Sequence, residues 1–215
     1  MGRDMPDGTA LRRRMADPDG ARRRDLLQTL VLVCIGLTPA WLIPAPWSQV
    51  WLGVGLVVAA PSVWASWRHA PWVPTPADDV PRIAGALALA PGARCCDLGA
   101  GDGRMLVALW RATGAVCDGV EAAPVPWLLG QLRLAAARAP GRLRLGDLYA
   151  ADLSAYDAVY VWGTAYSVGT ERFTARMRAT LRPGARIVAY GEPVWGLEPV
   201  SVDRSGQRPV RVYVL

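Results

Sequence analysis

A glycine-rich loop is the feature that most constrains the fold of this chain. Residues 97–103 read Asp-Leu-Gly-Ala-Gly-Asp-Gly, and they separate a short apolar run, 93–96, from a helix-patterned segment, 105–110. This placement predicts the turn between a buried strand and the helix after it. Glycine takes positive φ without strain and lets a ligand approach the backbone, and the helix N-terminus beyond it offers free N–H groups to an anion. The loop therefore predicts an α/β fold with a nucleotide-like cofactor.

The acids around the loop indicate which cofactor it binds. The dinucleotide fingerprint reads G-x-G-x-x-G, whereas this loop reads D-x-G-x-G-x-G with an acid at its start. Glu121 closes the next apolar stretch, where a carboxylate would hold ribose hydroxyls, and Asp147 ends a further run, where the adenine amino group would lie. Paired glycines at such a turn also occur for packing reasons, so the assignment depends on the acids. Their order favours S-adenosyl-L-methionine, bound by Asp97, Gly99, Gly101, Gly103, Glu121 and Asp147.

Helical and strand patterns alternate after residue 79, which predicts a parallel sheet covered on both faces. The expected helices are 80–89, 104–113, 126–138 and 171–180, and the expected strands are 94–97, 115–121, 143–147, 157–162, 185–190, 198–203 and 210–215. The last two strands flank a turn and form a closing antiparallel hairpin. This order matches the seven-stranded, Rossmann-like sheet of class I methyltransferases. A Rossmann dehydrogenase would need a second catalytic domain, for which no residues remain.

Two apolar runs precede this domain, at 26–43 and 50–67. Each has about 18 residues, which just covers a hydrocarbon core of about 30 Å. Arginines crowd the residues before the first run and Arg68 follows the second, so the positive-inside rule places both ends in the cytosol. The sequence therefore predicts a basic, disordered tail over 1–25, a transmembrane helical hairpin over 26–68 and a catalytic domain over 69–215. The domain would lie on the cytosolic side of the cell (inner) membrane.

Three other interpretations of the apolar runs stay open. A secretory signal peptide also has a basic start and an apolar centre, but it would export the domain and leave the second run unexplained. Pro39 and Pro61 could break the runs into a re-entrant or interfacial element that does not span the bilayer. A buried helical pair fits less well, because neither run has a polar stripe.

Composition excludes several kinds of chemistry. All 24 basic residues are arginine and the net charge is +6, which fits a GC-rich coding sequence. The basic tail has no interleaved aromatic residues to stack on bases, so no nucleic-acid partner is expected. The single histidine and four cysteines are not spaced for zinc, so no metal site is expected, and the cysteines indicate a reducing compartment.

Four segments carry a resemblance to a known family: 71–76, which reads Pro-Trp-Val-Pro-Thr-Pro, the loop 97–104, and the segments 147–157 and 183–189. From about residue 71 onward the chain resembles the membrane-anchored, seven-strand lysine methyltransferases that modify the mitochondrial ATP synthase c-subunit and the adenine nucleotide translocase, and in particular their bacterial relatives. An apolar N-terminal membrane segment is also a trait of that family.

The resemblance implies roles for individual residues. It places Thr75 near the methionine end of the cofactor, Glu121 on the ribose, and Asp147 with Leu148 near the adenine. A stiff linker is the alternative interpretation of residues 74–76. After its ribose acid the family has leucine, asparagine, proline and tryptophan, whereas here Glu121 is followed by Ala-Ala-Pro-Val-Pro-Trp. That wall of the adenosine pocket therefore departs from the family pattern.

Candidate residues for the methyl acceptor follow the fourth and fifth strands: Trp162, Tyr166, Glu192 and Trp195. A lysine acceptor must lose a proton before attack, and a carboxylate such as Glu192 could accept hydrogen bonds from the amine while aromatic rings such as Trp195 hold its stem or charge. Glu192 could equally be solvated and Trp195 part of the core. An Asn-Pro-Pro-Tyr motif, typical of enzymes that methylate bases or glutamine amides, is absent after the fourth strand.

Together these features predict a membrane-anchored methyltransferase that uses S-adenosyl-L-methionine and acts on a lysine of a membrane or membrane-adjacent protein. One alternative is an enzyme that methylates a lipid or a hydrophobic small molecule. The other is a non-catalytic membrane adaptor that only binds the cofactor.

Overall fold

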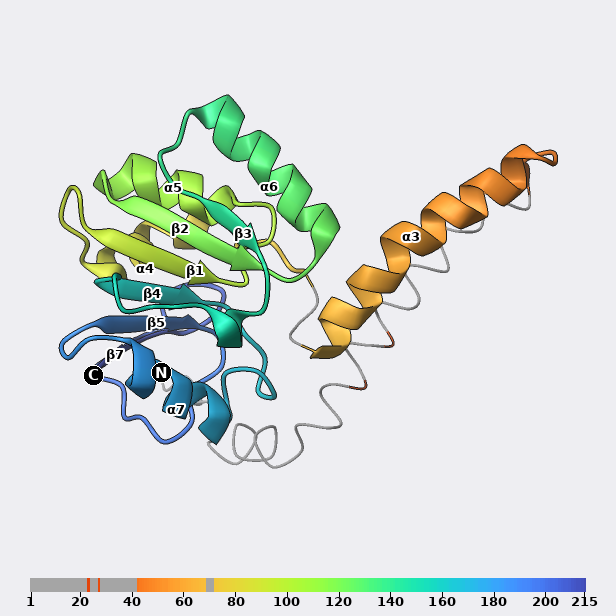
Figure 1. Ribbon diagram of the computed structural model, residues 1–215. Coiled ribbons are helices and arrows are strands. Elements are labelled where there is room, and N and C mark those ends of the chain that lie inside the picture. Colours follow the sequence, from red (N-terminus) through yellow and green to blue (C-terminus); the bar gives the residue numbers. More distant parts are fainter. Residues whose placement is uncertain (1–22, 24–26, 28–41, 69–71) are drawn as a thin grey trace, which may run out of the picture.

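The computed structural model describes residues 23, 27, 42–68 and 72–215. Seven strands form one sheet in the order β3-β2-β1-β4-β5-β7-β6 (Figure 1). Strands β1 to β5 pair in parallel, whereas β7 is antiparallel to both β5 and β6. This topology confirms the seven-stranded, Rossmann-like sheet with an antiparallel C-terminal hairpin that the sequence predicts.

The elements lie close to their predicted positions. The strands are β1 (Arg94–Leu98), β2 (Val116–Glu121), β3 (Leu143–Leu145), β4 (Ala158–Val161), β5 (Arg186–Tyr190), β6 (Ser201–Asp203) and β7 (Val210–Val214). The helices are α3 (Trp47–Arg68), α4 (Val80–Leu87), α5 (Arg104–Thr113), α6 (Pro124–Ala137) and α7 (Glu171–Thr180), with short 3₁₀ turns η2 (Ala77–Asp79) and η3 (Leu148–Ala150). Helices α5 and α7 have the predicted bounds.

Two differences from the predicted bounds have local causes. Strand β3 ends at Leu145, because the Asp147 side chain accepts a hydrogen bond from the Tyr149 amide at 2.8 Å and turns the chain into η3. Helix α6 begins at Pro124, two residues early, since proline fits the first turn of a helix, where its missing N–H has no partner to lose.

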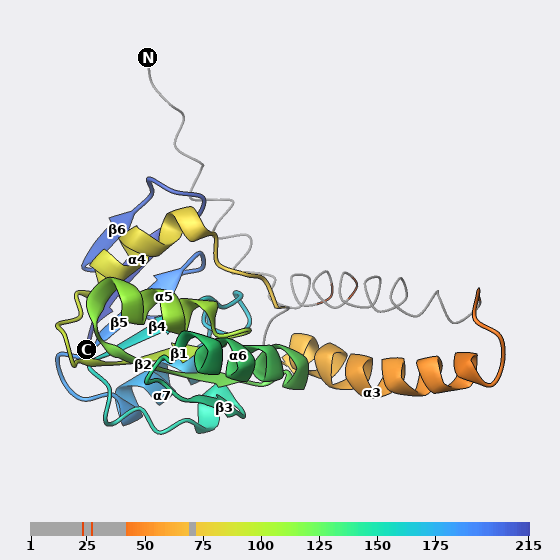
Figure 2. The same cartoon turned by 90° about the horizontal axis from the view of Figure 1, so that it is seen from above.

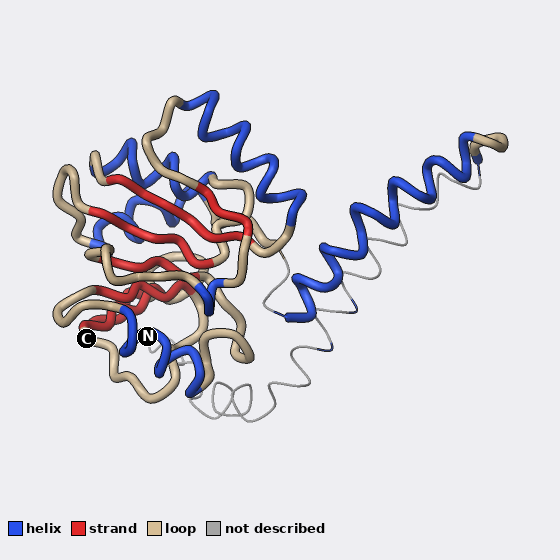
Figure 3. Tube along the Cα trace, viewed as in Figure 1, coloured by secondary structure: helices blue, strands red, loops and turns tan. Residues whose placement is uncertain are grey.

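Helices cover both faces of the sheet, as Figures 2 and 3 show. Helices α4, α5 and α6 pack on one face, where Leu106 and Leu109 of α5 join the core. On the other face, Phe173 and Met177 of α7 pack with residues of the segment 148–156. Because the inner strands are covered on both sides, β1 and β4 are buried for nearly their whole length.

Helix α6 packs tightly against the glycine loop. A Cβ atom on Gly130 of α6 would lie 2.3 Å from Leu143 Cδ2 and 3.2 Å from the Asp102 carbonyl carbon. A Cβ atom on Gly103 would in turn lie 3.3 Å from Gly130 Cα. The two glycines therefore let the helix backbone approach the loop and hold it in place.

Helix α3 extends away from the carboxyl edge of the sheet and contacts the domain at α6 (Figures 1 and 2). It contains the second apolar run and continues through Pro61. Large apolar side chains are exposed along it: Trp47, Val50, Trp51, Leu52, Val54, Leu56, Val57 and Trp64.

The predicted transmembrane hairpin is not confirmed. Within the described part of the chain, no helix combines the length and apolar character that crossing a bilayer requires. The first run, 26–43, lies outside the described residues except for Leu27, Leu42 and Ile43, and so does the predicted tail except for Arg23.

Candidate active site

The glycine loop lies at the carboxyl edge of the sheet, where β1 leads into α5. Gly99, Gly101 and Gly103 have φ values of 98°, 55° and 69°. The backbone amides of Gly99 and Ala100 donate to the Val120 carbonyl at 2.9 and 3.0 Å. The loop is thus tied to the end of β2, and its three glycines take the left-handed conformation that other residues adopt only with strain.

Glu121, the last residue of β2, binds the backbone of the loop through its carboxylate. One of its carboxylate oxygens accepts from the Gly101 amide and the other from the Ala123 amide, both at 2.7 Å. Burial raises the pKa of this carboxyl above its usual range, while these backbone hydrogen bonds oppose the shift. Glu121 therefore ties the loop to the end of β2, and its carboxylate lies where the ribose is predicted to bind.

Asp97 is a buried carboxyl group beside the loop. Its residue is 3% exposed, and its side chain makes no hydrogen bond to another residue in the described part of the chain. Burial, and then the negative charge of Glu121, raise the pKa of Asp97 well above its usual range. A buried carboxylate without a partner is costly unless a ligand supplies a donor.

Thr75 lies next to this group, as the predicted methionine end of the site requires. Its hydroxyl is 3.1 Å from the Tyr160 hydroxyl of β4, and Tyr160 is the register partner of Asp97. Burial and the charge of Asp97 raise the pKa of Tyr160. Residues 75, 97 and 160, from three distant parts of the sequence, therefore form one polar cluster.

Trp72 covers the glycine loop, a role that sequence reasoning did not reveal. A Cβ atom placed on Gly101 would lie 2.7 Å from Trp72 Nε1 and 2.8 Å from Trp72 Cδ1. The indole therefore packs against the loop at Gly101, and 46% of the residue stays exposed. A contact across 29 positions leaves no local pattern, so only the fold reveals it.

Asp147 and Leu148 follow β3 at the same edge. The Gly146 amide donates to the Glu121 carbonyl at 2.9 Å, which brings this turn beside the end of β2. Leu148 is buried, and Tyr149 Oη donates to the Ser167 carbonyl at 2.6 Å. The structure therefore places the predicted ribose acid and the predicted adenine residues on adjacent strand ends.

The acceptor candidates lie at the ends of β4 and β5. Trp162 packs edge-on against Tyr190, with ring centroids 4.9 Å apart, and the Arg208 guanidinium lies over its indole. Glu192 follows β5 and interacts electrostatically with the buried Arg211. Trp195 lies farther along that loop, where its carbonyl accepts from Thr174 of α7 and its side chain is half-exposed. Trp162 and Glu192 thus sit at the carboxyl edge, whereas Trp195 lies beside α7.

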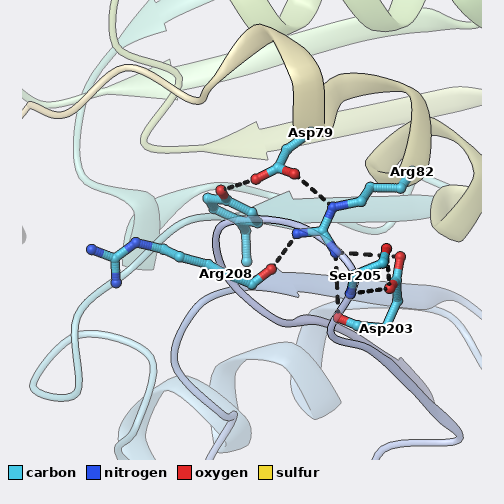
Figure 4. Close-up of polar contacts among 6 residues, drawn as sticks. Asp79, Arg82, Asp203, Ser205 and Arg208 are labelled. Atoms are coloured by element: carbon cyan, nitrogen blue, oxygen red, sulfur yellow. Dashed lines mark hydrogen bonds and ion pairs between the residues drawn. The ribbon is translucent and has the colours of Figure 1, made fainter. Parts of the chain in front are cut away.

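A polar network fixes the segment that carries Trp72 and Thr75 (Figure 4). The buried Asp79 carboxylate accepts from Arg82 Nε at 2.7 Å and from the Tyr190 hydroxyl of β5. Arg82 also pairs with Asp203 of β6 at 3.3 Å and donates to the Arg208 carbonyl. The hydrogen bond from Arg82 lowers the pKa of Asp79. The residues just after Thr75 are thereby tied to the C-terminal hairpin.

Comparison with known proteins agrees with this geometry. Residues 97–201 match the family model of the ANTKMT methyltransferase domain. No curated protein matches the chain significantly.

Among solved structures, an RNA methyltransferase from Salinibacter ruber in complex with S-adenosyl-L-homocysteine is similar over 66% of this chain and 93% of its own, with 24% identity and a TM-score of 0.62. A SAM-dependent methyltransferase from Thiobacillus denitrificans, also in complex with S-adenosyl-L-homocysteine, is 26% identical over 60% of this chain and 53% of its own, with a TM-score of 0.49. The similarity to the first of these structures shows that the fold is that of a class I methyltransferase. The matching family model supports a methyltransferase domain that uses S-adenosyl-L-methionine.

Proposed function

We propose that this chain is an S-adenosyl-L-methionine-dependent methyltransferase that N-methylates a lysine of a membrane or membrane-adjacent protein, as a member of the lysine methyltransferase family that it resembles. The observation that carries the proposal is the buried Asp97 carboxylate beside three left-handed glycines at the carboxyl edge of the sheet. Ligands of open α/β sheets bind at this edge.

The residues present fit the cofactor. Asp97 would accept a hydrogen bond from the ammonium of the methionine part, which gives its carboxylate the donor that the described residues do not supply. Glu121 uses one lone pair of each oxygen on a backbone amide, and its remaining lone pairs would accept from ribose hydroxyls. Asp147 and Leu148 would flank the adenine, and Thr75 and Trp72 would cover the methionine side. The bound cofactor supplies a methyl group on a positively charged sulfur.

The acceptor side has to present a neutral amine in line with that methyl group and exclude water. A lysine ammonium has a reference pKa near 10.4, so it must lose a proton on binding. In the proposed arrangement Glu192 accepts a hydrogen bond from the amine, while Trp162 and Tyr166 contact its methylene stem.

The bilayer as a partner is supported by α3. Its exposed apolar side chains form a surface that is unusual for a helix facing water, and such surfaces mark interaction sites. Tryptophans occur near both ends of the helix, as they do at membrane interfaces. We therefore place α3 in the interface of the cell (inner) membrane, with the methyltransferase domain on the cytosolic side.

The decisive experiment is transfer of a labelled methyl group from S-adenosyl-L-methionine into isolated membranes by the full chain. Label recovered in protein, and as methyl-lysine after acid hydrolysis, is the expected result. The Asp97→Asn variant should transfer at least tenfold less at sub-saturating cofactor, whereas Arg178→Gln, which changes an exposed residue of α7, should transfer as much as the wild type.

Two other outcomes would replace the proposal. Label in extractable lipid would identify a lipid or hydrophobic small molecule as the acceptor. Measurable cofactor binding without any transfer would favour the non-catalytic adaptor.

A further inference from the structure

The amino edge of the sheet, opposite the glycine loop, contains a second concave site. A cavity of about 300 Å³ is lined by Arg94, Val116, Asp118, Pro140, Arg142 and Arg144. Arg94 begins β1, Val116 and Asp118 lie in the first half of β2, and Arg142 and Arg144 lie just before and within β3. The three strands are parallel, so the cavity opens toward their amino ends, whereas Asp97 and Glu121 lie toward their carboxyl ends, and the proposed methyl transfer makes no use of the cavity.

A buried acid organises this cavity, which we call the arginine pocket. Asp118 is 5% exposed and accepts three hydrogen bonds, from Arg94 Nη2 at 2.9 Å, Tyr156 Oη at 2.8 Å and the Arg142 amide at 2.8 Å. The Arg94 guanidinium also lies over the Tyr156 ring, 4.9 Å from its centroid. Arg94 is therefore held in one position before any ligand arrives, which reduces the entropy lost on binding.

The other two arginines supply unused positive charge. Arg142, just before β3, and Arg144, within it, flank Leu143, so in the extended chain their side chains point to the same face. Neither guanidinium forms an ion pair with any of the described residues. Asp152 interacts electrostatically with Arg144, but the two side chains lie beyond ion-pair distance. Three guanidinium groups and one carboxylate leave the pocket a net charge of +2.

This combination fits a doubly charged oxyanion. Guanidinium groups bind phosphate through paired N–H donors, and a phosphate monoester carries close to two negative charges at neutral pH with three strong acceptor oxygens. The cavity has the size of a small ligand site, with room for a phosphate and a short organic group. We propose that the arginine pocket binds a phosphate monoester. A free phosphorylated small molecule and the headgroup of phosphatidic acid offer the same chemistry.

Calorimetric titration of the full chain with glycerol 3-phosphate tests the proposal, since this probe has no adenine and avoids the cofactor site. We expect saturable binding that weakens at least tenfold in the double variant Arg142→Gln/Arg144→Gln and is unchanged in Arg178→Gln. Glycerol should not bind. A double variant with lysine at both positions keeps the charge but loses the paired donors, so it should fall between the wild type and the glutamine variant.

Acidity provides a second readout. A phosphate monoester becomes singly charged below a pKa near 6, so binding should be several-fold weaker at pH 5 than at pH 7.5. Sedimentation with vesicles of phosphatidic acid, compared with phosphatidylcholine, identifies the source. A loss of phosphatidic acid binding in the glutamine variant would assign the lipid, whereas equal sedimentation would assign a free small molecule.

Equal affinities for glycerol 3-phosphate in the glutamine variant and the wild type would overturn the proposal, and so would equal losses in that variant and in Arg178→Gln. Both variants change exposed side chains, and their melting temperatures would show that the fold is retained. An absence of binding by the wild type at low ionic strength would overturn it as well.

Discussion

Asp97 is the residue at which function and stability oppose each other. Burial disfavours its charge, and no described residue donates a hydrogen bond to it. We expect Asp97→Asn to lower cofactor affinity at least tenfold, because a charge-assisted hydrogen bond contributes about 1.5–3 kcal/mol. The same change should raise the free energy of unfolding of the ligand-free protein at neutral pH. Calorimetry and chemical denaturation measure the two effects.

The pH dependence distinguishes this explanation from a simple loss of structure. Because folding raises the pKa of Asp97, the folded state keeps a proton that the unfolded state releases above pH 4, so stability falls as pH increases. The stability advantage of Asp97→Asn should therefore grow above pH 4 and disappear below it. An advantage that does not depend on pH would contradict the assignment.

Gly101 and Trp72 offer a second test at this scale. Gly101→Ala places a methyl group where the Trp72 indole lies and forces alanine to a φ of 55°. We expect it to destabilise the protein by about 1–2 kcal/mol for the backbone conformation, plus the cost of displacing the indole. In a double-mutant cycle, Trp72→Ala should remove the second part. Full additivity of the two changes would show that the indole does not cover the loop in solution.

Elements of the fold follow from short-range signals more reliably than the contacts between them. Helix α5 lies between the capping residues Gly103 and Gly114, and α7 follows its N-cap Thr170, whose hydroxyl accepts from the Phe173 amide. Those signals are local, so the sequence predicts both helices correctly. Trp72, Tyr160 and the Asp79–Arg82 pair join segments far apart in the chain, and no local pattern could reveal them.

The position of the segment that contains Trp72 and Thr75 depends on the ion pair between Asp79 and Arg82. Arg82→Gln leaves the Asp79 carboxylate without its cation, so we expect a loss of about 1–3 kcal/mol in the free energy of unfolding. Exposed Arg178→Gln should stay within about 0.5 kcal/mol of the wild type. Urea denaturation of both variants and the wild type measures these free energies of unfolding.

Acid titration checks the same network. The hydrogen bond from Arg82 lowers the pKa of Asp79, so its contribution is present above pH 4 and is lost as pH falls through the folded-state value. The Arg82→Gln variant should show a smaller loss of stability on the acid side than the wild type. Parallel acid curves would argue against the pair as the cause.

For the whole molecule, the methyltransferase domain should fold without α3. Both buried cores consist of residues from 83 onward, so a fragment of residues 72–215 keeps them intact. We expect this fragment to bind the cofactor as the full chain does but to lose sedimentation with lipid vesicles. Equal sedimentation of the fragment and the full chain would contradict a membrane role for α3.

The sequence predicts the domain better than the segment before it. The parallel strands and the edge that carries the acids follow from the alternating patterns and the glycine loop. Apolar composition alone does not distinguish a spanning helix from one that lies in an interface, and for that reason the expectation for 50–67 went further than the described helix supports.

The antiparallel placement of β7 has a consequence for aggregation. Strand β7 occupies the edge of β5 along its full length and separates β5 from β6. If β7 detached, the apolar strand β5 would present a row of unpaired backbone groups, which is a template for pairing with another chain. The C-terminal hairpin therefore also protects β5 from pairing with a strand of another copy of this protein.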